Sequence, residues 1–115
     1  MAFDITKSRE IINIMENYIA SIRPEPKIRP KLDIGFDLTD QSVFLCEIRP
    51  KWNNPQEIQR HAYAKATFVQ SRSVWKIFWL RANLKWYPYD PKPTVKNLND
   101  FLKIVDEDAY GCFKG

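Results

Sequence analysis

A strand is indicated most strongly by the stretch Ile28-Arg-Pro-Lys-Leu-Asp-Ile-Gly-Phe-Asp-Leu38. Its apolar residues point one way, at positions 28, 32, 34, 36 and 38, and its charged residues point the other, at positions 29, 31, 33 and 37. A period of two is typical of a strand with one buried and one solvated face. Thr39 to Ser42 has turn composition, and Val43 to Arg49 predicts the partner strand of a hairpin.

A second hairpin is predicted further along the chain, after a loop over Pro50 to Glu57. Its strands are His61 to Val69 and Val74 to Trp86, joined by a four-residue turn at 70–73. That turn length pairs Val69 with Val74 and therefore places Phe68 beside Trp75, Ala66 beside Ile77 and Ala64 beside Trp79. The alanines of the first strand would also suit a helix, which is the alternative for that segment.

One helix is predicted on each side of these strands. Asp4 or Thr6 can cap the first, which runs to Ile22 with apolar residues at three- and four-residue spacing. The second runs from Asn97 to Asp108, before Gly111. We therefore predict an α+β domain with an N-terminal helix, a mainly antiparallel four-stranded sheet made of two hairpins, and a C-terminal helix.

Length and composition predict one domain over residues 1–115. The 115 residues are 44% hydrophobic, enough for one core. Cys46 and Cys112 lie far apart, and His61 is the single histidine, so we expect reduced thiols and neither zinc nor a cofactor. No apolar stretch has the length of a secretory signal or a membrane span. We expect a cytoplasmic protein that does not bind membranes, and the pattern does not indicate an oligomeric state.

Several motifs resemble a family of small bacterial proteins known as domain of unknown function 3024. They are Lys65-Ala-Thr-Phe-Val, Val74-Trp-Lys-Ile-Phe-Trp, Leu84-Lys-Trp and Asp106-Glu-Asp-Ala-Tyr-Gly-Cys-Phe-Lys-Gly. The likeness extends over most of the chain from Lys31 onward, and the tryptophan spacing and the ending carry it. The resemblance implies no activity.

Charge and aromatic residues are concentrated between Ile58 and Tyr89. These 32 residues hold no Asp or Glu, six of the 18 cations and eight of the 16 aromatic residues. Cations interleaved with rings are what a surface needs to bind a nucleic-acid strand or another polyanion, such as an acidic protein. The expected phosphate contacts are Lys65, Arg72, Lys76, Arg81 and Lys85, and the expected stacking residues are Trp79 and Trp86.

The spacing within the predicted fourth strand would place five of its residues on one face, namely Trp75, Trp79, Arg81, Lys85 and Tyr87. The alternative, which we favour, is that Trp75 and Trp79 belong to the core, since isolated aromatic residues are more often buried than ligand-binding. A protein-interaction adaptor is a further alternative for the chain. It would be favoured by a dry apolar patch without converging cations.

An enzymatic alternative rests on Asp33 with Glu47, Arg49 and Lys51, a pattern similar to metal-dependent nucleases. Two carboxylates can hold a divalent ion, and a nearby cation can orient the attacked phosphate. An ion pair between Asp33 and Arg49 on a solvated strand explains the same residues, and we favour it. No other catalytic motif is present, so we expect that the protein is not an enzyme. The acidic run from Asp106 to Asp108 predicts a compensating cation from the sheet.

Overall fold

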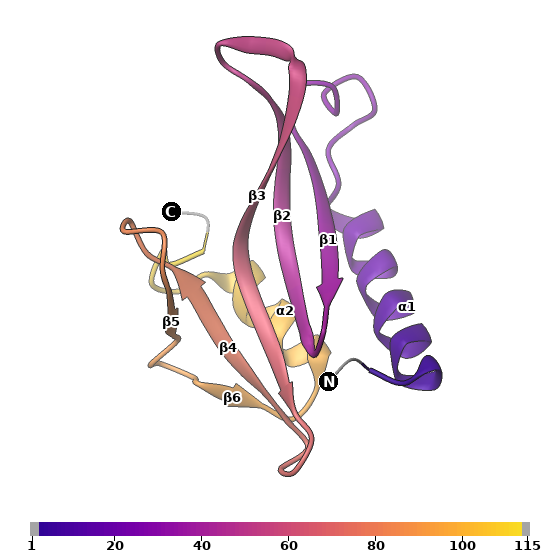
Figure 1. Cartoon of the computed structure of the whole chain (residues 1–115), viewed down its shortest axis with the longest axis vertical. Coiled ribbons are helices and arrows are strands. Elements are labelled where there is room, and N and C mark those ends of the chain that lie inside the picture. The colour runs from indigo at the N-terminus through magenta and orange to yellow at the C-terminus, as the bar shows by residue number, and fades with distance from the viewer. Residues whose placement is uncertain (1–2, 114–115) are drawn as a thin grey trace.

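The computed structural model describes residues 3–113, which form two helices and one antiparallel sheet (Figure 1). The elements in chain order are α1 (Ile5–Ile22), β1 (Asp33–Thr39), β2 (Ser42–Lys51), β3 (Asn54–Val69), β4 (Val74–Leu80), β5 (Trp86–Pro88), β6 (Thr94–Val95) and α2 (Leu98–Glu107). The α+β class, the flanking helices and the antiparallel sheet are confirmed, but the sheet has six strands where four were predicted.

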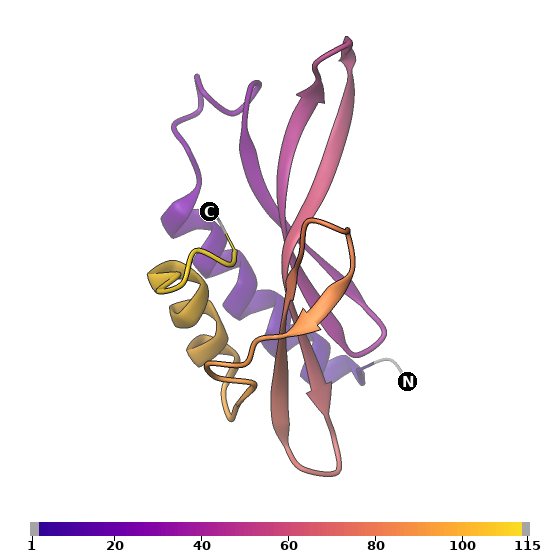
Figure 2. The same cartoon turned by 90° about the vertical axis from the view of Figure 1, so that its left-hand side faces the viewer.

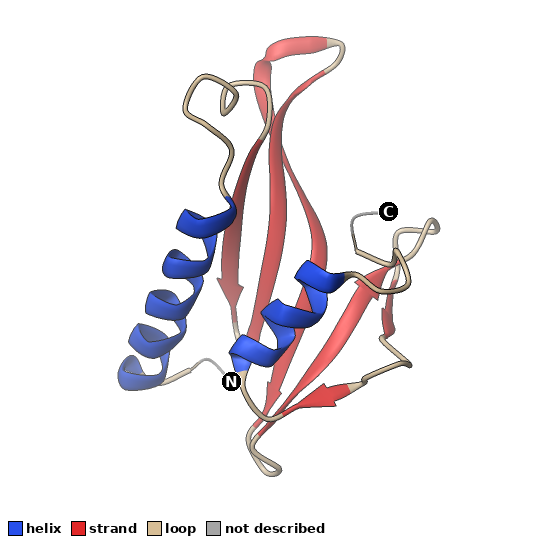
Figure 3. Ribbon diagram, turned by 180° about the vertical axis from the view of Figure 1, so that it is seen from behind, coloured by secondary structure: helices blue, strands red, loops and turns tan. Residues whose placement is uncertain are grey.

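Both helices pack on the same face of the sheet, as Figures 2 and 3 show. The strand order is β1-β2-β3-β4-β5, and β6 pairs with the remaining half of β4. We call the face covered by the helices the inner face and the opposite one the outer face. The core lies between the inner face and the helices, where Ile11, Met15, Leu45, Ile77 and Phe101 are almost fully buried.

The predicted turn at 70–73 and its register are confirmed. Val69 pairs with Val74, Phe68 with Trp75, Ala66 with Ile77 and Ala64 with Trp79. Ala64 and Ala66 are completely buried, so small residues on β3 leave room for large ones on β4. The helical alternative for 61–69 is therefore wrong.

The first predicted strand begins later than its pattern indicates. Backbone hydrogen bonds from Ile28 to Glu25 and from Leu32 to Ile28 fold residues 25–32 into turns, and β1 begins at Asp33. Pro26 and Pro30 lack the N–H groups that a strand would use here, which explains why the alternation does not become strand.

The predicted loop over 50–57 is the end of a long hairpin. Strands β2 and β3 continue to a turn at Trp52 and Asn53, and the hairpin extends beyond the helices (Figure 1). The pairing with β1 ends at Ile48, so Pro50 lies where β2 has a neighbour on one side only. A proline is tolerated in such an edge segment.

The fourth predicted strand is two strands. β4 ends at Leu80, and the chain reverses through residues 81–85 before β5. The Arg81 backbone N–H donates to the Lys85 carbonyl (3.1 Å), and the Asn83 carboxamide oxygen accepts from the Lys85 N–H (3.1 Å). Leu84 has a positive φ of 64°. Asn83 is a residue type that favours turns, and the prediction of one long strand overlooked it.

Helix α1 begins as predicted at Asp4, whose carboxylate accepts a hydrogen bond from the Lys7 backbone N–H (2.7 Å). Helix α2 follows Asn97 and ends at Glu107, and the next residue, Asp108, has the left-handed conformation. Among residues 3–113, no helix is both long and apolar enough to cross a membrane.

Candidate nucleic-acid interface

Three aromatic side chains surround Lys65 on the outer face. Lys65 on β3 pairs with Phe44 on β2 and with Phe78 on β4, so the three share one face. Trp86 on β5 pairs with Leu80 and lies on the same face as Phe78. All four side chains are half-buried. We call Phe44, Lys65, Phe78 and Trp86 the outer-face cluster.

The Lys65 ammonium lies within cation–π distance of every ring in this cluster. Its Nζ is 5.5 Å from the centre of Phe44, 5.2 Å from Phe78 and 5.9 Å from the Trp86 ring. The rings of Phe44 and Trp86 also meet edge to face at 5.8 Å. The outer-face cluster is therefore a set of rings held around one positive charge, on the side of the sheet opposite the helices.

Three further predicted phosphate contacts lie on or next to the strands that carry this cluster. Lys76 is exposed on β4, two residues before Phe78 and hence on the outer face. Lys85 is exposed in the turn before Trp86, and Arg72 is exposed in the turn between β3 and β4.

Trp79 and Arg81 lie elsewhere, so the seven predicted residues do not form one surface. Trp79 pairs with buried Ala64 and with Tyr87, which places Trp79 and Tyr87 on the inner face. The Arg81 guanidinium is 5.4 Å from the Trp79 ring and 4.7 Å from the Tyr87 ring. Trp75 is buried, with its ring 5.1 Å from Phe68, and Trp79 packs partly buried against the core.

The single-face arrangement predicted for the fourth strand is thus correct only in part. Trp75, Trp79 and Tyr87 share the inner face, but the strand ends before Lys85, which lies in the turn. The core interpretation of Trp75 is confirmed by its 2% exposure.

Ion pairs between described residues are concentrated in one part of the fold. Within residues 3–113, all five join residues between Arg23 and Arg60. By contrast, none of the described cations within residues 61–113 forms an ion pair. These cations are Lys65, Arg72, Lys76, Arg81, Lys85, Lys92, Lys96 and Lys103. Of the six cations in the acid-free segment, Arg60 pairs with Asp37, and the other five remain without an ion pair to any described residue.

Phe44 and Phe78 are the members of the cluster that sequence reasoning missed. Phe44 lies in Val43-Phe-Leu-Cys, where every residue is apolar and alternation cannot assign a face. The predicted pairing of Phe68 with Trp75 also places Lys65 opposite Phe78, so the hairpin register was the signal for Phe78.

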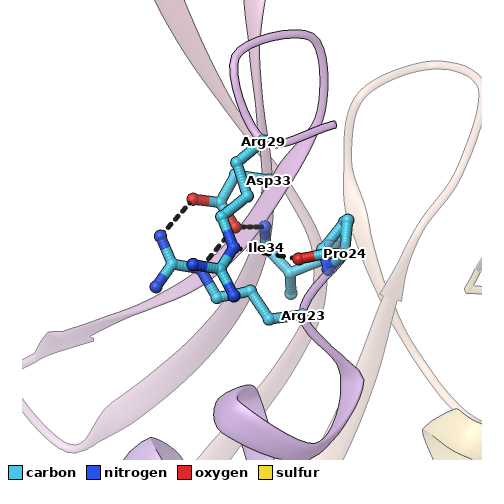
Figure 4. A network of polar contacts seen from close by, with 5 residues as sticks. All are labelled: Arg23, Pro24, Arg29, Asp33 and Ile34. Carbon is cyan, nitrogen blue, oxygen red and sulfur yellow. Dashed lines mark hydrogen bonds and ion pairs between the residues drawn. The ribbon is translucent and has the colours of Figure 1, made fainter. Parts of the chain in front are cut away.

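The nuclease-like arrangement does not form, because Asp33 and Glu47 lie on opposite faces. Asp33 pairs with Ile48, whereas Glu47 pairs with Ile34, the next residue along β1. Asp33 is held by Arg23 at the end of α1, which donates from Nε (2.8 Å) and Nη2 (2.7 Å) (Figure 4). The hydrogen bond from Arg23 is the largest cause that holds the pKa of Asp33 below its usual value.

The remaining residues of that pattern are also separate from Asp33. Arg49 pairs with Glu47 (3.8 Å), so the predicted ion pair between Arg49 and Asp33 is wrong, and Lys51 pairs with Glu57 (3.1 Å). Figure 4 shows that Arg29 is nearby but donates to the Pro24 carbonyl (2.9 Å). Within the part of the chain that the structure describes, no group of three or more His, Cys, Asp or Glu side chains could hold a metal ion.

The carboxylates at the acidic end of α2 accept hydrogen bonds from groups other than the predicted cation of the sheet. Tyr18 Oη donates to the Asp106 carboxylate (2.6 Å), and the Phe113 backbone N–H donates to Asp108 (3.0 Å). Burial, and then the bond to Asp106, raise the pKa of Tyr18 well above its usual value. No cation of the sheet pairs with these carboxylates in residues 3–113.

The fold and the site define an α+β domain with helices on one sheet face and a basic, aromatic cluster on the other. The chain belongs to the family described as "Domain of unknown function (DUF3024)", whose pattern matches residues 3–115. Neither the curated proteins nor the solved structures contain a significant match.

Proposed function

We propose that this protein is a small binding module that holds single-stranded nucleic acid on its outer face. The observation that supports this most is the outer-face cluster, in which three half-exposed rings surround a lysine on the helix-free side of the sheet. A strand binds such a surface by stacking its bases on rings while cations contact its phosphates.

Charge favours a polyanion over the adaptor alternative. An adaptor patch would be dry and apolar, but Lys65 lies at the centre of the rings, and Lys76 and Lys85 flank them without ion pairs to any described residue. In this proposal Lys65, Lys76 and Lys85 contact phosphates and Trp86 stacks on a base, and Arg72 lies in the turn before β4. Trp79 lies on the inner face with Arg81 beside its ring, so these two predicted residues are not part of the proposed contact.

The test is fluorescence anisotropy of a short, labelled, mixed-sequence oligonucleotide in low salt, with single-stranded DNA, single-stranded RNA and duplex DNA compared. Affinity for the single strands should be highest and should fall steeply as salt is added, because each phosphate contact releases counterions. Absence of binding to all three in low salt would end the proposal.

Two matched pairs of variants locate the contact. Trp86→Leu removes a ring of the cluster, and Trp52→Leu removes a ring that is 93% exposed at the hairpin tip. Lys76→Gln removes an outer-face cation, and Lys31→Gln removes an exposed cation before β1. Trp86→Leu should weaken binding by about 1–3 kcal/mol. Lys76→Gln should reduce the slope of log affinity against log salt concentration by about one. An equal loss in both controls would contradict the assignment of the outer face.

A further inference from the structure

A second basic surface lies away from the outer-face cluster, where α2 meets the end of the sheet. It is an open groove of about 700 Å³. Figure 1 shows its elements at the lower end of the sheet, where β6 leads into α2 beside the turn between β3 and β4. Four cations from separate segments line it: Arg72 from that turn, Lys92 from the loop after β5, Lys96 between β6 and α2, and Lys103 from α2.

The charges of this groove are not balanced by the protein. Asp100 and Glu107 also line it, so four cations against two carboxylates leave an excess of two positive charges. All four cations are exposed, and none forms an ion pair with a described residue. Like charges held around one depression repel each other, and an anion between them removes that repulsion.

The size of the groove and its donors favour a phosphate chain over a single small anion. The volume exceeds what one phosphate fills, and the cations come from four places around the groove rather than from one point. Lysine ammonium groups bind phosphate oxygens as point charges, and an arginine can bind two oxygens at once. The groove is also lined by Thr94 and Asn97, whose hydroxyl and carboxamide can donate to further oxygens.

We infer that this groove binds consecutive phosphate groups, either of a free polyphosphate or of a nucleic-acid backbone. We call it the phosphate groove. It does not depend on the outer-face cluster, since no residue of that cluster lines the groove, although Val74 of β4 does and Arg72 is also among the predicted phosphate contacts.

The test is isothermal titration calorimetry of the full chain with tripolyphosphate in low salt. We expect saturable binding that weakens as salt is added. Lys96→Gln combined with Lys103→Gln should lower the affinity roughly tenfold or more, whereas Lys31→Gln should change it little. Both altered lysines are exposed, so circular dichroism should show an unchanged fold.

Competition experiments distinguish a nucleic-acid backbone from free polyphosphate as the ligand. If a single-stranded oligonucleotide displaces tripolyphosphate from wild type and from Trp86→Leu alike, the source is a nucleic-acid backbone; if it does not, the source is free polyphosphate. Lack of saturable tripolyphosphate binding overturns the inference, as does an equal loss in Lys31→Gln. Equal displacement by a polyglutamate peptide also overturns it, because the groove would then select charge and not phosphate.

The experiments can contradict the proposed function without contradicting this inference, and the reverse. Loss of oligonucleotide binding in Trp86→Leu with intact tripolyphosphate binding supports both surfaces. Tripolyphosphate binding by a protein that binds no oligonucleotide would retain the groove and end the proposed function.

Discussion

Trp86 and Phe44 meet edge to face at 5.8 Å, although β3 and β4 lie between their strands. Neighbouring strands are about 4.8 Å apart, so β2 and β5 are separated by three such steps. The rings therefore meet across Lys65 and Phe78, which lie on the two strands between them. This contact connects the short strand β5 to the centre of the sheet.

Trp86→Leu should lower the free energy of unfolding by about 1–2 kcal/mol, because it removes an aromatic pair and a cation–π contact from a half-buried site. Urea unfolding followed by circular dichroism measures the change. Trp52→Leu at the exposed hairpin tip should shift it by less than about 0.5 kcal/mol. Equal stability of the two variants would show that the ring contact does not stabilise β5.

Ala64→Val should destabilise the protein by about 1–3 kcal/mol, because the added methyl groups have no space between Leu45 and Trp79. Thermal unfolding measures the loss. Ala82→Val, in the exposed turn before β5, serves as the control and should be nearly neutral. A neutral Ala64→Val would contradict the close packing of β3 against β4.

The register of this hairpin could be predicted because a short turn leaves one pairing. Four residues between Val69 and Val74 fix every pair up to Ala64 and Trp79. By contrast, the outer-face cluster needs the position of Phe44 on β2, and an all-apolar strand carries no alternation from which its face can be read. The contact of Phe44 with Trp86 further depends on the turn at Asn83, which makes β5 a separate strand.

The site on Asp33 was not predictable for a different reason. Opposite charges at Asp33 and Arg49 suggested a cross-strand pair, but a register with Ile48 opposite Asp33 separates them. The partner that Asp33 has, Arg23, comes from the end of α1, and local strand patterns contain no information about where a helix end will pack.

Asp33→Asn should lower the midpoint of thermal unfolding by a few degrees at pH 7. Arg23 holds the pKa of Asp33 below its unfolded value, so the pair contributes stability above that unfolded pKa and loses it as pH falls through the folded pKa. The difference between wild type and variant should therefore shrink in acid, below about pH 4. A difference that stays constant into strong acid would contradict the ion pair as its cause.

Cys46 should be unreactive in the folded protein. Its side chain is 1% exposed, and burial, followed by the bond that Sγ donates to Asp37 (3.4 Å), raises its pKa to about 12. The thiolate is the reactive form, so at pH 8 its population is lower by roughly a thousandfold than in the unfolded chain. The raised pKa also means that the thiol contributes stability which is lost as pH rises from about 8.5 toward the folded value.

Ellman's reagent at pH 8 measures this with Cys112→Ser, which leaves Cys46 as the single thiol. The folded variant should react slowly and the same variant in urea rapidly. Adding Asp37→Asn should speed the reaction of the folded protein, because the carboxylate that raises the pKa is gone while Arg60, which lowers it, remains. Equal rates with and without urea would contradict a buried thiol, whereas an unchanged rate in Asp37→Asn would assign the low reactivity to burial alone.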